Sequence, residues 1–507
     1  MKLSVNLNSA TFNGIDGVIV QVEVDISRGL PSFTIVGLAT TAVKEAKERV
    51  RSAIVNSGFE FPMGRIVINL SPADIKKEGA LLDLSMAVGL LLESGQISLE
   101  DIGEHIILGE LSLDGTIKSI NGVLAIVLEG KNLGYTKFIV PEDNKFEGAF
   151  VNETEVFPFN SLKEVIHYLK YKDIHPFKTE IKMPDKEEVL DFSDIIGQEA
   201  TLRALEISAS GNHNIALYGP PGCGKTMIAK RFSSILPDLS YDEALEVTKI
   251  YSVAGLLAKE GIINKRPIRS PHHSSSIISL IGGGTRLMPG EITLAHRGVL
   301  FLDEFLEFDK KFLENLRQPL EDKKINITRI FGKVIYPCDF ILLTSFNPCP
   351  CGNYGDKDKK CICTELERNR YISKLSGPLK ERIDMFIGMN KVEAHKLVES
   401  KGTIDSKIIK EKVIKARKIQ KDRFKGESFY YNSNMDLKAI NKYCVLSKEA
   451  KKEIKKYIKY FDLSARSYHR VLKIARTIAD LREVELISSE DLMEAIKYRT
   501  GLDNKVL

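Results

Sequence analysis

The sequence has no hydrophobic run long enough to cross a membrane, and its first residues, MKLSVNLNSATFNG, lack the apolar core of a secretion signal. We therefore expect a cytoplasmic protein with no membrane partner. Cysteine is also scarce, with 7 residues in the chain. In the cytoplasm these thiols are not expected to form a disulfide framework, so a cluster of cysteines favours metal binding.

The net charge of the 507 residues is small, at +5, but it is distributed unevenly. From Lys391 to Leu507 there are 28 Lys and Arg residues against 17 Asp and Glu residues, a net charge of +11, so the remainder carries about −6. Such a basic region is compatible with nucleic-acid binding and equally with a solvated, lysine-rich helical surface. The length predicts about two to four domains instead of one core.

Changes of pattern along the chain predict four segments. Residues 1–170 alternate short strand-like runs with helical stretches, and residues 171–190 are polar, contain proline and have no periodicity, which is typical of a linker. In residues 191–390 strands alternate with helices and glycine-rich turns, the pattern of an α/β domain with a parallel sheet. Residues 391–507 are predominantly helical, and Ser488 is expected to cap the last helix.

A phosphate-binding loop is predicted between an apolar strand and an amphipathic helix. The segment NIALYGPPGCGKTMIAKRF (214–232) fits the pattern G-x-x-x-x-G-K-[ST] in the strand-to-helix context that this motif requires. The glycines let backbone N–H groups curl round phosphates, the lysine reaches the β- and γ-phosphates of ATP, and the threonine hydroxyl ligates Mg²⁺. The loop consists of Gly219, Pro220, Pro221, Gly222, Cys223, Gly224, Lys225 and Thr226.

Two adjacent carboxylates follow another apolar strand in GVLFLDEF (298–305). Asp303 suits the ligand shell of Mg²⁺, and Glu304 suits the polarisation of an attacking water. An isolated Asp-Glu pair could simply begin a helix. In the same segment as the phosphate loop, the pair predicts an ATPase.

Four of the cysteines are concentrated in NPCPCGNYGDKDKKCIC (347–363). They form two C-x-C pairs, Cys349 with Cys351 and Cys361 with Cys363, separated by a nine-residue polar loop. Four thiolates satisfy tetrahedral Zn²⁺, so the pattern predicts a structural zinc site. Because the C-x-C spacing is shorter than the usual C-x₂₋₄-C, free thiols or a redox pair remain alternatives.

A basic β-hairpin is predicted in EDKKINITRIFGKVIYPCDF (321–340), where alternating isoleucines precede a glycine-containing tip. Its cations would meet the phosphates of DNA by charge, without reading sequence. The alternative is an exposed hairpin edge that lysines protect from aggregation. The candidate DNA-binding residues are Lys323, Lys324, Arg329 and Lys333.

Five longer motifs point to one family: SPHHSSSIISLIGGG (270–284), PGEITLAHRGVLFLDE (289–304), LRQPLEDKKINITR (316–329), NPCPCG (347–352) and SARSYHRVLKIARTIADL (464–481). They resemble the magnesium-chelatase-like AAA+ ATPases of the ComM/YifB family over essentially the whole chain. The resemblance implies a hexameric ATPase that uses ATP and Mg²⁺. For the ComM branch it implies a helicase that drives DNA branch migration during natural transformation. A magnesium-chelatase-like chaperone and a protein-remodelling ATPase are the alternatives.

The resemblance also implies roles for residues outside the two nucleotide motifs. Asn347, at the end of FILLTSFN, occupies the sensor-1 position, where it would orient the lytic water. Arg382 in SGPLKERID is a candidate arginine finger that acts on the nucleotide of a neighbouring subunit. Arg466 suits a sensor-2 role within its own chain, and Arg470 lies one turn further along. Each of these arginines could instead be a surface charge.

Three further expectations depend on the ring architecture. Ile195, Ile196 and Gln198 lie where AAA+ proteins hold adenine, although the isoleucines also suit core packing. The basic hairpin would point into the pore of the ring. His272 and His273 are adjacent, so they are not expected to ligate one metal together, and they are assigned to a polar loop at the pore or at a subunit interface.

Residues 66–142 resemble the proteolytic domain of Lon proteases, without its catalytic residues. The nucleophile position falls on Leu81 and the lysine position on Leu124. A Ser–Lys dyad needs a hydroxyl and an amine, and leucine supplies neither. We expect a domain for assembly, docking or regulation that is not a protease. The sequence thus predicts a multidomain α/β protein with an N-terminal Lon-protease-like α+β domain, a central AAA+ P-loop α/β domain and a C-terminal helical lid.

Overall fold

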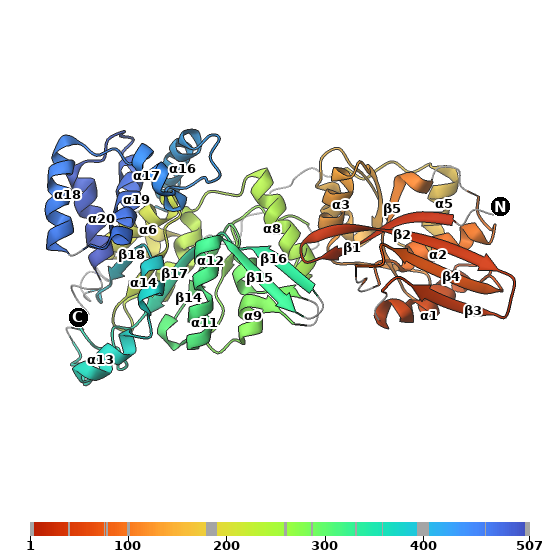
Figure 1. Cartoon of the computed structure of the whole chain (residues 1–507), viewed down its shortest axis with the longest axis horizontal. Helices are drawn as coiled ribbons and strands as arrows, with labels where there is room; N and C mark the ends of the chain where they lie inside the picture. Colours follow the sequence, from red (N-terminus) through yellow and green to blue (C-terminus); the bar gives the residue numbers. More distant parts are fainter. Residues whose placement is uncertain are drawn as a thin grey trace.

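The computed structural model shows an elongated molecule with three parts arranged along its long axis (Figure 1). The N-terminal part (residues 5–178) lies at one end, the central part (190–392) in the middle, and the helical part (405–501) at the other end. No helix in the portion of the chain that is described is long and apolar enough to span a membrane. The structure describes residues 5–38, 41–75, 77, 80–98, 102–178, 190–257, 261–284, 287–329, 332–356, 358–392, 405–461 and 463–501, so most of the expected linker lies outside the described residues.

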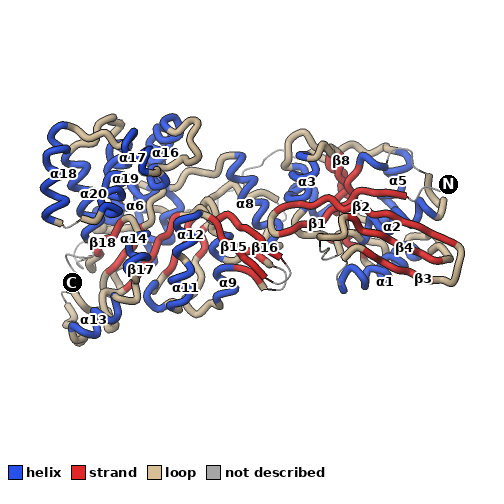
Figure 2. The backbone as a smooth tube through the Cα atoms, viewed as in Figure 1, coloured by secondary structure: helices blue, strands red, loops and turns tan. Residues whose placement is uncertain are grey.

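The N-terminal part is built on a seven-stranded mixed sheet in the order β3-β4-β2-β1-β5-β8-β9 (Figure 2). Strand β2 pairs antiparallel with both β1 and β4, whereas β5, β8 and β9 run parallel. Val20, Val22 and Val24 of β2 are fully buried, because a period of two places them on one face of the sheet. The strands are β1 (Val5–Asn13), β2 (Asp16–Ser27), β3 (Ser32–Val36), β4 (Arg65–Ser71), β5 (His105–Ile107), β8 (Lys137–Pro141) and β9 (Glu155–Phe159), with a separate ribbon of β6 (Glu110–Leu111) and β7 (Ile117–Lys118).

Helices cover both faces of this sheet. Val20, Val22 and Val24 share a hydrophobic cluster with α1 and α2, whereas Ile19 of the same strand packs in a second cluster with α3. Helix α2 is buried on almost every side, which explains the nearly unbroken apolar sequence of its middle. The helices are α1 (Thr41–Asn56), α2 (Asp83–Glu93), α3 (Val123–Asn132), α4 (Lys145–Ala149) and α5 (Leu162–Tyr171).

The central part contains a five-stranded sheet in the order β11-β14-β17-β10-β18, in which all neighbouring strands are parallel. Strands β14 and β17 are buried along their whole length, as their continuous apolar sequences indicate. Because the strands are parallel, their carboxyl ends meet at one edge of the sheet. The strands are β10 (Ile215–Tyr218), β11 (Ile268–Arg269), β14 (Val299–Leu302), β17 (Ile341–Phe346) and β18 (Met385–Gly388).

Two antiparallel ribbons extend from the central part. The longer ribbon is the predicted hairpin, formed by β15 (Lys324–Arg329) and β16 (Gly332–Pro337), and the shorter one joins β12 (Gly282–Gly283) to β13 (Met288–Pro289). The helices of this part are α6 (Glu199–Gly211), α7 (Lys225–Arg231), α8 (Tyr241–Ala254), α9 (Ile277–Ile281), α10 (Glu291–Leu294), α11 (Lys310–Asn315), α12 (Arg317–Asp322), α13 (Glu365–Ile372) and α14 (Gly377–Arg382).

The helical part packs on α6 of the central part, which α16 and α19 both contact. One hydrophobic cluster runs through β10, β17 and these helices, so the two parts share a core. Ser488 caps the last helix with a reciprocal capping box, as predicted. The helices are α16 (Ser406–Arg423), α17 (Leu437–Tyr443), α18 (Lys448–Tyr460), α19 (Ala465–Leu481) and α20 (Ser489–Thr500).

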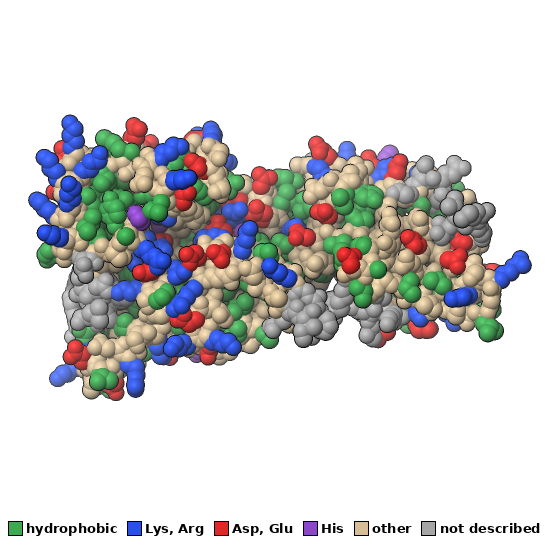
Figure 3. Space-filling model, in the orientation of Figure 1, with side chains coloured by type: hydrophobic (Ala, Val, Ile, Leu, Met, Phe, Trp, Pro, Cys, Tyr) green, Lys and Arg blue, Asp and Glu red, His purple; other side chains and the backbone are tan. Residues whose placement is uncertain are grey.

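Basic side chains gather on the outer surface of the helical part (Figure 3). Helix α18 alone exposes six lysines. The positive charge of this segment therefore lies on an exposed face, which is compatible with both interpretations of the sequence. The exposed lysines are Lys448, Lys451, Lys452, Lys455, Lys456 and Lys459.

Candidate active site

The parallel sheet brings the three predicted nucleotide motifs together at its carboxyl edge. Gly219 follows β10, Asp303 follows β14, and Asn347 follows β17. These three strands are neighbours in the sheet, because β17 pairs with both β14 and β10. Residues that are more than 40 positions apart in the sequence therefore meet at one site.

The phosphate loop leads directly into α7. Gly222 and Gly224 have φ angles of 81° and 88°, a left-handed conformation that side chains rarely adopt. The Lys225 ammonium donates to the carbonyl oxygens of Gly219 at 2.7 Å and Pro220 at 3.0 Å, and to Oδ1 of Asn347 at 3.2 Å. Burial lowers the pKa of Lys225. The expected phosphate-binding lysine and the expected sensor are thus in direct contact.

Oxygen ligands suited to Mg²⁺ lie beside this lysine. The hydroxyl of Thr226 donates to Oδ2 of Asp303 at 2.6 Å, and the Ser345 hydroxyl donates to Oδ1 of the same carboxylate. A carboxylate and a hydroxyl at this separation are hard oxygen ligands, which Mg²⁺ prefers, so these residues fit the ion. The contribution of Ser345 was not predicted, because it depends on the pairing of β14 with β17.

Glu304 projects toward solvent from the turn after β14. Its φ angle is 50°, and 56% of its side chain is exposed. Oε2 lies 3.2 Å from Nδ1 of His273, and the His273 ring lies 4.1 Å from that of His272. The loop that carries His272 and His273 therefore borders the carboxyl edge of the sheet in the same chain. Its contact with Glu304 was missed from the sequence.

The expected adenine-binding segment contacts the phosphate loop through Gln198. Gln198 donates to the backbone oxygen of Asn390 at 2.8 Å and to that of Cys223 at 3.4 Å. Ile195 is buried in the core, whereas Ile196 is half-buried. Ile195 therefore serves core packing, and Ile196 keeps surface available for a ligand.

The four clustered cysteines come together after β17. Their sulfur atoms all lie within 4.8 Å of one another. The Sγ–Sγ distances are 3.4 Å between Cys349 and Cys351, 3.7 Å between Cys349 and Cys361, and 3.6 Å between Cys351 and Cys361. A tetrahedral ion with Zn–S bonds of about 2.3 Å requires separations of about 3.8 Å, so the cluster including Cys363 could hold zinc.

The cysteine loop also packs against the phosphate loop. A Cβ atom added at Gly352 would lie 3.0 Å from Cδ of Pro221, so the backbone of Gly352 approaches the Pro221 ring closely. Asp356 of the same loop forms a 2.7 Å ion pair with Lys391, which follows β18. The cysteine cluster is therefore positioned to fix the geometry of the nucleotide edge.

The three candidate arginines lie at the opposite edge of the sheet. Asn214, directly before β10, donates to the backbone oxygen of Arg382 at 3.0 Å. Arg382 is paired with Glu321, Arg466 with Glu381 at 2.7 Å, and Arg470 with Asp384, directly before β18. Burial would raise the pKa of Asp384, but Arg470 and His213 bring it well below its usual range.

This placement disfavours the same-chain role expected for Arg466, which stays a prediction. The four residues of β10 separate the two edges by about 13 Å, at about 3.3 Å per residue. Because Arg466 contacts α14 at the amino edge, it does not reach the phosphate loop of its own chain. Arg382 and Arg470 also line a pocket of about 450 Å³ between the central and helical parts.

The candidate DNA-binding residues divide between the base and the tip of the hairpin. Lys323 precedes β15 and forms a 3.4 Å ion pair with Asp339, and Lys324 pairs with Pro337 at the base. Lys333 is exposed opposite Thr328 near the tip. The backbone of Arg329 pairs with Gly332, but its side chain lies outside the described residues. Of the four candidate residues, Lys333 is therefore the one whose described side chain is exposed near the tip of the hairpin.

In the N-terminal part, the two positions that would carry a Ser–Lys dyad are both apolar and buried. Leu81 is 6% exposed and Leu124 is fully buried. Both belong to the hydrophobic cluster that packs α3 against the sheet. The fold therefore brings the two positions together in one buried hydrophobic cluster.

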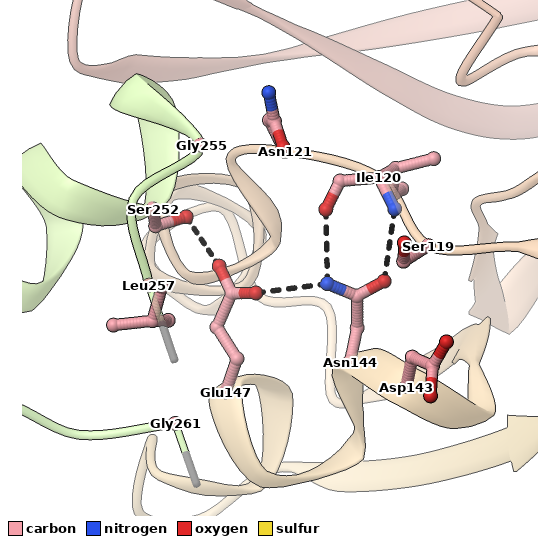
Figure 4. A pocket seen from close by; sticks show the side chains of 10 residues that line it. All are labelled: Ser119, Ile120, Asn121, Asp143, Asn144, Glu147, Ser252, Gly255, Leu257 and Gly261. Carbon is pink, nitrogen blue, oxygen red and sulfur yellow. Dashed lines mark hydrogen bonds between the residues drawn. The ribbon is translucent and has the colours of Figure 1, made fainter. Parts of the chain in front are cut away.

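A polar pocket of about 190 Å³ lies where the N-terminal part meets α8 (Figure 4). Glu147 accepts hydrogen bonds from the Leu124 backbone at 2.8 Å, from the Asn144 amide at 3.0 Å and from the Ser252 hydroxyl of α8. Gly122 N donates to the backbone oxygen of Ser252 at 3.2 Å. Burial raises the pKa of Glu147. This buried carboxylate joins the two parts.

Comparison with known proteins covers all three parts of the chain. The profile described as magnesium chelatase, subunit ChlI, matches residues 191–397, and the ChlI C-terminal profile matches residues 403–499. A further profile, described as subunit ChlI of Mg-chelatase, matches residues 22–144. Lon protease 2 of Bacillus subtilis is 26% identical over 153 residues, which are 28% of this chain and 27% of that protein.

Two relatives match along nearly their whole length. YifB of Salmonella typhimurium is 40% identical over 488 residues, which cover 96% of this chain and 95% of that protein. Competence protein ComM of Haemophilus influenzae is 37% identical over 506 residues, or 98% of each chain. Together with the three profile matches, these identities show that the chain belongs to the ComM/YifB family of magnesium-chelatase-like AAA+ ATPases.

Proposed function

We propose that this protein is a hexameric ring motor that hydrolyses ATP to move DNA, and that it promotes branch migration during natural transformation or recombination. The observation that carries the proposal is the connection between the basic hairpin and the nucleotide site. Strand β16 ends at Pro337, and β17 begins at Ile341 and leads directly to Asn347. A change at the nucleotide therefore has a short covalent route to Lys333 near the hairpin tip. The name of the competence relative also agrees with a DNA substrate.

ATP hydrolysis at the carboxyl edge would use five groups of this chain. Lys225 binds the β- and γ-phosphates, and Thr226 and Asp303 hold Mg²⁺, which neutralises phosphate charge when bound. Glu304 accepts a proton from the attacking water, and Asn347 orients that water. In this assignment Ile196 and Gln198 border the adenine. The contacts of Lys225 with Asn347 and of Thr226 with Asp303 support it.

Ring assembly would complete the site with arginine from a neighbouring subunit. Arg382, Arg466 and Arg470 lie at the amino edge of the sheet, away from the phosphate loop of their own chain. In the proposed ring, head-to-tail packing would bring the amino edge of one subunit to the carboxyl edge of the next. Arg382 would then stabilise charge in the transition state, an effect worth about 10³- to 10⁵-fold in other arginine-finger enzymes. Arg466 and Arg470 would support the same contact.

The cysteine cluster would hold a structural zinc ion. Cys349, Cys351, Cys361 and Cys363 supply four sulfur ligands, which leave no open coordination position for catalysis. The ion would fix the loop that touches Pro221 and leaves β17. The N-terminal part would serve assembly or substrate docking, because Leu81 and Leu124 cannot act as a proteolytic dyad.

The test measures ATP hydrolysis by the purified protein alone and with single-stranded DNA, four-way junction DNA or an unfolded protein. We expect DNA to stimulate turnover and Glu304→Gln to bind ATP without hydrolysing it. If DNA neither binds at moderate salt nor stimulates hydrolysis, the motor proposal is wrong. Stimulation by unfolded protein alone would favour a remodelling ATPase, and stimulation by neither would favour a chelatase-like chaperone.

A further inference from the structure

The turn between β1 and β2 lies against the basic hairpin, although the two belong to different parts of the molecule (Figure 1). The turn consists of Gly14 and Ile15, because the residues on either side of them pair with each other. A Cβ atom added at Gly14 would lie 2.3 Å from Cγ1 of Val334, which belongs to β16. The backbone of the turn therefore touches the strand that carries Lys333.

The turn also contributes a side chain to the core under the hairpin. Ile15 is half-buried and packs against the hydrophobic cluster that contains the inward-facing residues of β15 and β16. Among the described residues, the other members of this cluster all belong to the central part. The hairpin residues in the cluster are Ile325, Ile327, Val334 and Tyr336.

A charged residue beside the turn reaches both α8 and β16. Asp16 forms a 2.7 Å ion pair with Lys249 of α8. Burial and the nearby carboxylate of Asp16 raise the pKa of Tyr336, so the Tyr336 hydroxyl keeps its proton and donates to the backbone oxygen of Leu287. The turn is therefore anchored on α8 and in contact with the hairpin at the same time.

The hairpin needs such support because a two-stranded ribbon is marginally stable on its own in water. Ile277 and Ile281 of α9 pack against the same cluster and support the ribbon from the central part. The β1–β2 turn supports it at Val334, which directly follows the exposed Lys333. A side chain that must meet a ligand at a defined place depends on packed neighbours that hold its backbone.

We infer that Gly14 and Ile15 are positioning residues for the hairpin, through which the N-terminal part holds Lys333 in the orientation that engages DNA. The inference rests on the proposed function, because it needs DNA on the hairpin. It gives the N-terminal part a direct task in DNA engagement, one that requires no chemistry at Leu81 or Leu124.

The first experiment compares the ATPase of full-length Ile15→Ala with that of the wild type and of Ile26→Ala over a series of four-way junction DNA concentrations. Ile26 is the matched control, because it is a half-buried isoleucine of β2 that packs in a cluster of the N-terminal part alone. Ile15→Ala is expected to raise the DNA concentration for half-maximal stimulation by about three- to tenfold, the effect of losing most of one apolar contact. We expect kcat without DNA and KM for ATP to stay unchanged, because Ile15 does not belong to the nucleotide site.

A DNA response of Ile15→Ala that equals that of the wild type, or a loss that Ile26→Ala shares, overturns the inference. A stronger response to DNA in Ile15→Ala also overturns it, because the turn would then restrain the hairpin. Failure of the proposed function looks different: DNA then fails to stimulate the wild type, and the inference fails with it.

The second experiment links the turn to the hairpin in a variant that combines Gly14→Cys with Val334→Cys. The Cβ atoms at these positions would lie 3.5 Å apart, within the range of a disulfide. Peptide mass spectrometry measures the crosslink after mild oxidation, and wild-type protein treated in parallel reports any effect on the native thiols. The oxidised variant is expected to keep the DNA stimulation of its reduced form, because the turn and the hairpin act as one body. Failure to crosslink, or a loss of stimulation that a reductant restores, would mean that the hairpin works apart from the turn and would overturn the inference.

Discussion

The candidate catalytic positions are polar and partly exposed in the central part, whereas they are apolar and buried in the N-terminal part. At the carboxyl edge of the central sheet, Lys225, Asp303 and Asn347 are polar and partly exposed. Lys225 donates a hydrogen bond to Asn347, and Asp303 accepts one from Thr226, which directly follows Lys225. In the N-terminal part, Leu81 and Leu124 lie in one apolar cluster. Both parts combine a sheet with covering helices. The comparison shows that the side chains decide whether a scaffold carries chemistry, and that the fold alone does not.

The largest expected effect tests the apolar side of this comparison. Leu124→Lys buries an unpaired ammonium in the α3 cluster and is expected to lower the free energy of unfolding by about 3–5 kcal/mol. Urea denaturation followed by circular dichroism measures it. Leu133→Lys is the matched control, because Leu133 directly follows α3 and is 58% exposed. A tolerated lysine at position 124 would mean that this region admits charge. ATP-dependent peptide cleavage that depends on residues 1–170 would overturn the non-protease assignment.

The second largest expected effect tests the polar residues at the carboxyl edge of the central sheet. Lys225→Ala removes the cation expected at the phosphates and should lower kcat/KM for ATP by about 10²- to 10³-fold. A coupled assay of ADP release measures the loss. Lys230→Ala changes an exposed lysine of the same helix and should behave like the wild type. Near-normal hydrolysis by Lys225→Ala would place the nucleotide site elsewhere.

The third effect separates a metal site from free thiols at the nucleotide edge. We expect about one zinc ion per chain by elemental analysis, falling below half an equivalent in Cys351→Ser because a tetrahedral site loses one of four ligands. Ile362→Ala, between Cys361 and Cys363 and 85% exposed, should keep the zinc. Wild-type protein with less than half an equivalent, unchanged by Cys351→Ser, would leave the thiols without a metal.

The smallest expected effect concerns the hairpin. Lys333→Ala should weaken DNA binding a few-fold and reduce the slope of log K against log salt by about 0.7 to 0.9, the value for one lost phosphate contact. Fluorescence anisotropy over a salt series measures it. Lys170→Ala, an exposed lysine of the N-terminal part, should leave the slope unchanged. An unchanged slope in Lys333→Ala would favour the lysine-protected hairpin edge.

The motifs that could be predicted from the sequence are contiguous and lie next to a strong local pattern. The phosphate loop, Asp303 and Asn347 each follow an apolar run of four to six residues, and parallel pairing of such runs brings their ends together. The cysteine cluster was predictable for the same reason, because its spacing is local. The capping box at Ser488 is another local signal.

Contacts that depend on packing between distant elements could not be predicted. The bond of Ser345 to Asp303 requires the pairing of β17 with β14, and the approach of His273 to Glu304 requires the path of an irregular loop. The edge occupied by Arg466 depends on how α19 packs beside α14. No periodicity or spacing in the chain encodes these arrangements.

The hydrogen bond between Glu147 and Ser252 joins the N-terminal part to the central part across the boundary that the sequence predicts. The polar stretch 171–190 marks a boundary in the sequence, yet the N-terminal part is attached to α8 by a buried carboxylate, a backbone hydrogen bond and the ion pair of Asp16 with Lys249. A protease cut within that stretch would break the chain and leave these contacts in place. The folded unit is therefore defined by contacts in space and not by the boundary in the sequence. A truncated central part would expose the polar groups that these contacts satisfy.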